Sequence, residues 1–246
     1  MSATRAEAGP PREAEPGRDR AIAAMFGRIA GFYDLLNHVF SLGIDRWWRR
    51  ELAKSAEPAG DGVMLDLASG TLDVALALVR RYPGGTVLAA DFCRPMLERG
   101  RRKLERDRPP VLPVCADARF IPLPDASAAC VTMAFGIRNI RPRSAAFAQM
   151  LRVLRPGGRA CILEFGSGRE RIWGGLYNLY LNRVMPLAGR LVSGDDGAYR
   201  YLAESIREFP AAEELAGELR RAGFAEVHWR RLTSGIVCLH VAVKGA

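Results

Sequence analysis

The chain has 246 residues, of which 49% are hydrophobic and 26% charged, and its formal net charge at pH 7 is +9. This length and composition fit one α/β domain, and no apolar run is long enough to predict a membrane-spanning helix. The basic residues are spread along the chain and all but three are arginine, so we predict no nucleic-acid partner. An excess of positive charge does favour peripheral contact with an anionic membrane.

The first part of the chain predicts a tail followed by helices. Residues 1–20 combine Pro and Gly with both charge signs and lack the apolar run of a signal peptide, so we expect a disordered tail and a cytoplasmic protein. A single domain then spans 21–246. Its first part, 21–54, has helical periodicity with a break near 41–43, and we expect a helical cap over 21–56.

From residue 63 onward, short apolar runs alternate with helical stretches. We predict strands at 63–68, 86–90, 111–115, 129–134 and 159–165, and helices at 73–82, 95–106 and 144–154. Such alternation is typical of a doubly wound, mostly parallel sheet. Residues 166–205 are predicted to be an inserted substrate cover, with an aromatic stretch at 173–192. A helix at 213–222 and a hairpin of 227–232 and 236–243 complete the domain.

Polar residues at the strand ends form the candidate site, because ligands of such sheets bind at the carboxyl ends of the strands. Asp66 lies in the first strand, and Gly70 and Thr71 form the following turn. Asp91 ends the second strand. Its sequence spacing from Gly70 suits an acid that accepts hydrogen bonds from ribose hydroxyls. The ends of the third and fourth strands contribute further residues: Asp117, Ala118 and Ala134.

These residues favour S-adenosylmethionine over a nicotinamide cofactor. The turn DLASGTLD at 66–73 lacks the G-x-G-x-x-G spacing of dinucleotide sites. The additional acid, Asp66, suits a ligand that carries a cationic amino-acid group. The five Cys and three His have no metal-ligand spacing, so we predict no metal site.

Several motifs outside this turn resemble the ubiquinone/menaquinone biosynthesis C-methyltransferase family, which is part of the class I S-adenosylmethionine-dependent methyltransferases. The motifs are FYDLLN at 32–37, SLGIDRW at 41–47, FGIRN at 135–139, LRPGGR at 154–159, LEF at 163–165, YRYLAESI at 199–206 and TSGIV at 233–237. The resemblance extends from Met25 to Val243.

The resemblance implies a seven-stranded sheet whose last strand is antiparallel, and methyl transfer to a ring carbon of a polyprenylated quinol. It places cofactor contacts on Thr71, Asp91, Asp117 and Ala118. Ala134 stands where a serine is common in the family. Leu72 stands where glycine is usual, so we expect the turn to relax to negative φ or the cofactor to shift, with binding retained.

Methyl transfer to a quinol ring needs a carbon activated by an adjacent phenolate. We predict that Arg138 stabilises the phenolate and that Asn139 orients the ring oxygen, while Tyr33, Tyr199 and Arg200 line the substrate pocket. The isoprenoid tail lies in the bilayer, so the N-terminal helices and residues 173–192 are the expected docking surface on the inner face of the cell membrane.

Other functions remain open from sequence alone. The substrate is a naphthoquinol in our preferred interpretation and a ubiquinone-precursor benzoquinol in the alternative. Leu72 also allows a non-catalytic homologue that only binds the cofactor. Nucleic-acid methylation is disfavoured because no Asn/Asp-Pro-Pro-Tyr/Phe motif follows the fourth strand, and a nicotinamide oxidoreductase by the glycine spacing. The sequence does not indicate an oligomeric state.

Overall fold

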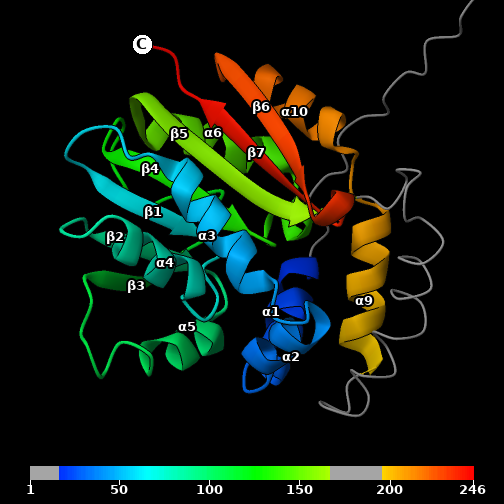
Figure 1. Cartoon of the computed structure of the whole chain (residues 1–246). Helices are drawn as coiled ribbons and strands as arrows, with labels where there is room; N and C mark the ends of the chain where they lie inside the picture. The colour runs from blue at the N-terminus through cyan, green and yellow to red at the C-terminus, as the bar shows by residue number, and fades with distance from the viewer. Residues whose placement is uncertain (1–16, 167–195) are drawn as a thin grey trace, which may run out of the picture.

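The computed structural model describes residues 17–166 and 196–246, and it contains a central sheet with helices on both faces (Figure 1). The seven strands lie in the order β3-β2-β1-β4-β5-β7-β6. Their bounds are β1 Val63–Leu67, β2 Val87–Asp91, β3 Val111–Cys115, β4 Ala128–Ala134, β5 Leu154–Phe165, β6 Glu226–Leu232 and β7 Val237–Val243. Strands β3, β2, β1, β4 and β5 pair in parallel, and β7 pairs antiparallel with both β5 and β6. The predicted fold class and the antiparallel last strand are therefore confirmed.

The helices divide between the two faces of the sheet. They are α1 Arg18–Ile29, α2 Tyr33–Phe40, α3 Asp45–Ala56, α4 Asp73–Arg81, α5 Arg94–Arg101, α6 Arg143–Val153, α9 Asp196–Arg207 and α10 Ala212–Arg221. On one face, α3 and α4 bury Leu52 and Leu78 against the sheet. On the other face, α6 and α10 bury Phe147 and Leu215. Both faces of the central strands are covered, which explains their continuous apolar sequences.

The N-terminal part contains three helices, whereas the sequence predicted a helical stretch with a single break. Helix α2 ends in a turn in which Leu42 and Gly43 both have positive φ, and this turn reverses the chain into α3. Helix α1 begins at Arg18, so the last residues of the expected tail are helical. In Figure 1, α1 and α2 lie together below the carboxyl ends of the strands.

Two other boundaries differ from the prediction. Strand β5 begins at Leu154 because residues 155–158 form an irregularity in its pairing with β4, where the sequence suggested a turn between helix and strand. Helix α9 begins inside the expected insertion 166–205 and ends two residues beyond it, and the aromatic stretch 173–192 lies outside the described residues. Within 17–166 and 196–246, none of the helices has the length and apolar character that a membrane crossing requires.

Candidate functional site

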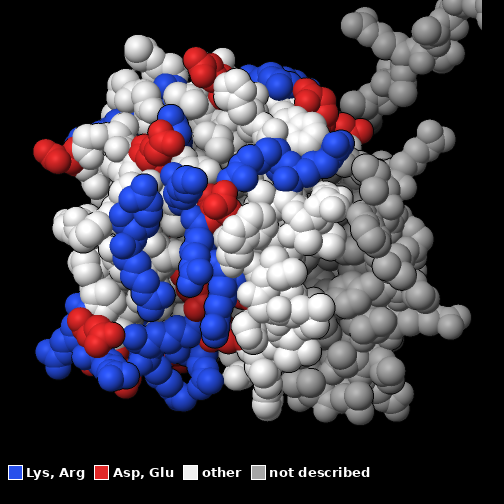
Figure 2. Space-filling model, in the orientation of Figure 1, with Lys and Arg blue, Asp and Glu red and all other residues white. Residues whose placement is uncertain are grey.

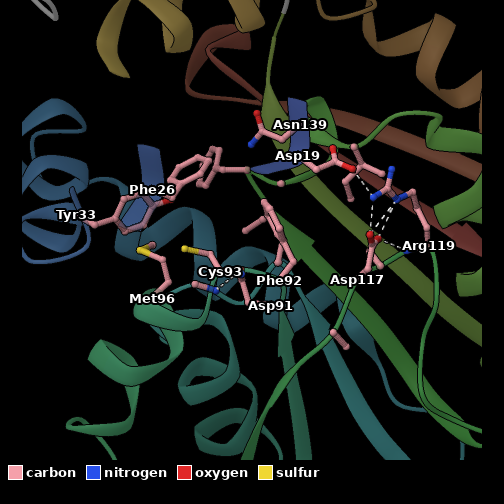
Figure 3. Close-up of a pocket in the computed structure, with 18 residues that line it drawn as sticks. Asp19, Phe26, Tyr33, Asp91, Phe92, Cys93, Met96, Asp117, Arg119 and Asn139 are labelled. Atoms are coloured by element: carbon pink, nitrogen blue, oxygen red, sulfur yellow. Dashed lines mark hydrogen bonds and ion pairs between the residues drawn. The ribbon is translucent and has the colours of Figure 1, made fainter. Parts of the chain in front are cut away.

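A pocket lies at the carboxyl ends of the strands, where α1 and α2 approach the sheet (Figure 3). It is open to solvent on one side, and both apolar and charged side chains line it. Phe26 and Tyr33 lie on one side, and Asp117 and Arg119 on the other. Residues predicted from sequence that line it are Tyr33, Gly70, Asp91, Asp117, Ala118, Ala134 and Asn139.

Asp91, at the end of β2, fixes the glycine turn that follows β1. Its Oδ2 accepts a hydrogen bond from the Gly70 amide at 2.8 Å, and its Oδ1 accepts one from the Cys93 amide at 2.7 Å. Burial raises the pKa of this carboxyl group. Each carboxylate oxygen has two acceptor sites, so two remain for hydroxyl groups of a ligand in the pocket.

Two small residues let the ends of β1 and β4 approach each other beside this turn. A Cβ atom at Gly136 would lie 2.5 Å from the Cβ of Ala68, and both residues line the pocket. A side chain at position 136 would therefore push the two strand ends apart. The spare acceptor sites of the nearby Asp91 carboxylate suit a ligand that carries ribose hydroxyls.

Asp66, which was predicted as a cofactor contact, lies beneath the turn and is not among the residues that line the pocket. Its side chain is fully buried and accepts hydrogen bonds from Ser69 Oγ at 2.5 Å and Thr132 Oγ1 at 2.7 Å. Burial raises the pKa of Asp66 to about 7. The carboxyl group thus holds the turn in place from below.

We expect Asp66 to make stability depend on pH. The pKa of an unfolded aspartate is about 4, so between pH 4 and 7 the folded protein retains a proton that the unfolded chain has released. The free energy of unfolding should therefore fall as pH rises through this window, by at most about 1.4 kcal/mol per pH unit, and then level off. Urea denaturation from pH 5 to 8 should show this fall relative to Asp66→Asn. Parallel curves for the two proteins would contradict the prediction.

Thr71, for which the resemblance implies a cofactor contact, is also not among the residues that line the pocket. Its Oγ1 donates a hydrogen bond to Asp34 of α2 at 2.5 Å. The other oxygen of Asp34 lies 2.8 Å from Lys103 Nζ, which is also 2.6 Å from Asp73 of α4. These contacts connect the turn after β1 to α2, to α4 and to the segment after α5.

Leu72 keeps a left-handed backbone, with φ of 70°, so the turn has not relaxed to negative φ. Its side chain is fully buried and turned away from the pocket, against Gly100 of α5. A Cβ atom at Gly100 would lie only 2.5 Å from Leu72 Cγ. The glycine usual in the family is thus replaced by a leucine that fills the space over a helical glycine.

Arg119 was missed by the sequence analysis, although it contacts one of the predicted residues. Its Nε lies 3.0 and 3.1 Å from the two Asp117 oxygens, and its Nη2 forms a 2.6 Å ion pair with Asp19 of α1. Burial alone raises the pKa of Asp117, but the hydrogen bonds from Arg119 outweigh it and hold the pKa below its usual value. Asp19 lay in the expected tail, and its only signal is that it is an acid in the first turn of a helix, where acids are favoured.

Arg138, which was predicted to stabilise a phenolate, is not among the residues that line the pocket. The guanidinium is buried, and its Nη1 lies 2.7 Å from Glu164 Oε1 and 2.5 Å from the Phe135 carbonyl oxygen. The group also lies over the Phe165 ring, at 5.6 Å from the centroid. Arg138 therefore joins the turn after β4 to the end of β5.

Asn139, the next residue, does line the pocket. Its Oδ1 accepts a hydrogen bond from the Tyr201 hydroxyl at 2.9 Å, and its carbonyl accepts one from Arg18 at 3.0 Å. Arg18 also lies 3.5 Å from the Tyr201 hydroxyl. Tyr201 and Arg18 were not predicted as site residues, although Tyr201 belongs to the motif at 199–206.

The predicted substrate residues are only partly described. Tyr33 lines the pocket and packs edge-to-face against Phe26, with ring centroids 6.1 Å apart. Tyr199 and Arg200 belong to α9, but their side chains lie outside the described part of the chain. Aromatic side chains of α1 and α2 therefore form the apolar side of the pocket mouth.

Comparison with known sequences identifies the family. A sequence model of the ubiE/COQ5 methyltransferase family matches residues 15–244. The chain belongs to this family. A demethylmenaquinone methyltransferase of Thermus thermophilus is 45% identical over 88% of this chain and 98% of its own length. One from Deinococcus radiodurans is 41% identical over 97% and 99%. A ubiquinone/menaquinone biosynthesis C-methyltransferase of Geobacter sulfurreducens is 41% identical over 91% and 88%.

Solved structures of other methyltransferase-like proteins share the fold of this family member. A SAM-dependent methyltransferase of Thermotoga maritima aligns with a TM-score of 0.65 at 18% identity, covering 91% of this chain and 99% of its own. The [4+2]-cyclase SpnF aligns with a TM-score of 0.69 at 16% identity, covering 96% and 98%. At such low identity the likeness describes architecture alone, and the cyclase illustrates that this fold serves more than one chemistry.

Proposed function

We propose that the chain transfers a methyl group from S-adenosylmethionine to a ring carbon of a polyprenylated quinol, with demethylmenaquinol as the main substrate. The relatives named demethylmenaquinone methyltransferase support this substrate. A relative named for both ubiquinone and menaquinone biosynthesis supports a benzoquinol precursor as the alternative. The structural observation that carries the proposal is the buried Asp91 carboxylate, which lines the pocket at the strand ends and has acceptor sites to spare.

Different residues around the pocket contact different parts of the cofactor. When bound, S-adenosylmethionine supplies a methyl group that is already activated by its sulfonium charge. Asp91 accepts hydrogen bonds from the ribose hydroxyls, and Asp117 and Ala118 line the adenine side. Asp117 presents its backbone there, since Arg119 occupies its carboxylate. Ala134 brings only its methyl group and backbone to the pocket, so it excludes water without adding a polar contact.

Asn139 is our candidate for orienting the quinol. The Tyr201 hydroxyl donates to Oδ1 of Asn139, which leaves the amide Nδ2 as a donor without a partner in the described part of the chain. A donor at this position stabilises a developing phenolate oxygen on the ring and holds the ring carbon in line with the methyl group. Arg18, which contacts both Asn139 and Tyr201, adds positive charge near the same oxygen.

The experiment uses purified protein, S-adenosylmethionine and short-chain forms of demethylmenaquinol and the benzoquinol precursor, with products identified by mass spectrometry. We expect a methylated naphthoquinol as the main product. Asn139→Ala should lower kcat about 100-fold or more while calorimetry still detects cofactor binding. Tyr201→Phe, which keeps the ring, should have a smaller effect. Cofactor binding without turnover on either quinol would overturn the proposal in favour of a non-catalytic homologue.

The substrate tail determines where this reaction takes place. A polyprenyl chain stays in the bilayer, so an enzyme without a membrane-spanning helix in its described part must reach the ring at the membrane surface. We therefore place the enzyme on the cytoplasmic face of the cell membrane as a peripheral protein.

A further inference from the structure

Helix α2 and the turn that follows it expose a row of large apolar side chains. Phe32, Leu35 and Val39 are three and four residues apart, so they lie on one face of the helix. Leu35 is 53% exposed, and Leu42 at the tip of the turn is 88% exposed. Single exposed leucines are ordinary on protein surfaces, but a contiguous row of this kind is typical of an interaction site. We call these four residues the α2 ridge.

Basic side chains follow the α2 ridge along the outer side of α3. Trp47 is exposed at the start of α3, and Arg50 and Lys54 share its face at spacings of three and seven residues, with Arg46 beside them. Arg46, Arg50 and Lys54 form no ion pair within the part of the chain that the structure describes. Figure 2 shows basic side chains running beside an uncharged surface in the region of α1–α3.

The α2 ridge also lies next to the mouth of the pocket. Tyr33, which lines the pocket together with Phe26, directly follows Phe32 of the ridge. On another side of the same helix, Asp34 accepts the hydrogen bond from Thr71 in the turn after β1. A partner surface that contacts the ridge therefore lies close to the opening of the pocket, through which an apolar substrate enters.

We propose that the α2 ridge and the basic side of α3 dock on a bilayer surface that contains anionic lipids. This inference rests on the proposed function, because docking at this surface brings the pocket to the membrane-bound substrate. Aliphatic side chains at a helix tip insert among acyl chains, while arginine and lysine at the same level contact lipid phosphates.

The charge and the apolar side chains of this surface disfavour two other binding partners. A second copy of the chain in a two-fold arrangement would place Arg46 and Arg50 of both copies close together, which is repulsive. A nucleic acid would gain little from Leu35 and Leu42, because it offers no apolar layer to cover them.

The test measures sedimentation of the full chain with phosphatidylcholine vesicles, with and without phosphatidylglycerol. We expect binding only when the anionic lipid is present. Leu42→Glu and Arg50→Glu should each weaken it about tenfold. The matched controls lie away from the ridge: Leu112→Glu, at a residue 57% exposed on β3, and Arg221→Glu at the end of α10 should leave binding unchanged.

Activity assays separate failure of docking from failure of the proposed function. Leu42→Glu should retain full methyl transfer to a short-chain quinol in solution, but lose it to a long-chain quinol embedded in vesicles. Equal binding of Leu42→Glu and the natural chain would overturn the docking surface and leave the catalytic proposal standing. Dimer formation that Leu42→Glu abolishes would instead assign the ridge to self-association. Loss of RNA binding in the same variant would assign it to nucleic acid.

Discussion

Replacing Glu164 with alanine should destabilise the protein by about 3–5 kcal/mol, because it leaves the Arg138 guanidinium buried without its anion. Both side chains are almost fully buried, and the ion pair between them is 2.7 Å long. Glu164 also accepts a hydrogen bond from the Phe165 amide at 3.0 Å, so the substitution removes a second bond. Urea denaturation should show the loss, and cofactor binding should weaken with it because the turn after β4 lines the pocket.

A double variant distinguishes a structural Arg138 from a catalytic one. Replacing a buried ion pair by apolar residues of similar size is often neutral, so Arg138→Met with Glu164→Leu should recover most of the stability lost in either single variant. We expect the double variant to bind S-adenosylmethionine and to methylate the quinol. A folded, cofactor-binding double variant without methyl transfer would restore the direct role of Arg138 that its sequence position suggested.

Adding one methyl group at Gly100 should destabilise the protein by about 2–3 kcal/mol. The new Cβ atom would lie 2.5 Å from Leu72 Cγ and 3.0 Å from the Thr71 carbonyl carbon, and neither atom is the free end of a flexible side chain. Because Thr71 belongs to the turn beside the pocket, cofactor affinity should fall as well. Thermal denaturation and calorimetry on Gly100→Ala test both effects.

Two further variants complete this test. Leu72→Gly removes the clashing side chain, so Gly100→Ala should cost much less in that background than in the natural one. Gly217→Ala in α10 is the matched control, since its Cβ would meet only the end of the Arg221 side chain at 3.4 Å. It should stabilise the protein by up to about 1 kcal/mol, as alanine does in a helix interior. Equal costs of Gly100→Ala in both backgrounds would mean that Leu72 does not determine the packing there.

The parallel sheet was predictable because its strands are short apolar runs separated by helical stretches with clear ends. Strand β3, at residues 111–115, matches its predicted bounds, and the other parallel strands except β5 begin and end within one residue. The strand ends also located the pocket, since Asp91 and Asp117 both line it. Periodicity and topology are enough for this level of detail.

The directions of individual side chains were not predictable in the same way. Arg138 and Asn139 are neighbours in a short 3-10 turn, yet the first turns into the protein toward Glu164 and the second lines the pocket. Gly70 and Thr71 diverge similarly, with Thr71 bonded to α2. Position in the sequence places a residue at a strand end, but the partner that it meets in space decides which way it points.

Contacts between distant segments were also beyond the sequence. The ion pair between Asp19 and Arg119 joins residues 100 positions apart, and nothing in either neighbourhood marks them as partners. Composition assigned Asp19 to a disordered tail because Pro, Gly and charged residues precede it. The order of that segment comes from polar contacts made across the pocket, which composition does not record.

The start of α1 decides how short a version of this protein still keeps its pocket. A protein trimmed to begin at Ala21, where the apolar pattern starts, would lack both Arg18 and Asp19. Those two side chains bond the first turn of α1 to Asn139 and to Arg119. Removing them would take away the polar contacts that tie the first turn of α1 across the pocket, while the sheet and its core stay intact. Such a protein would fold and purify well, and its weak ligand binding would be mistaken for a property of the enzyme.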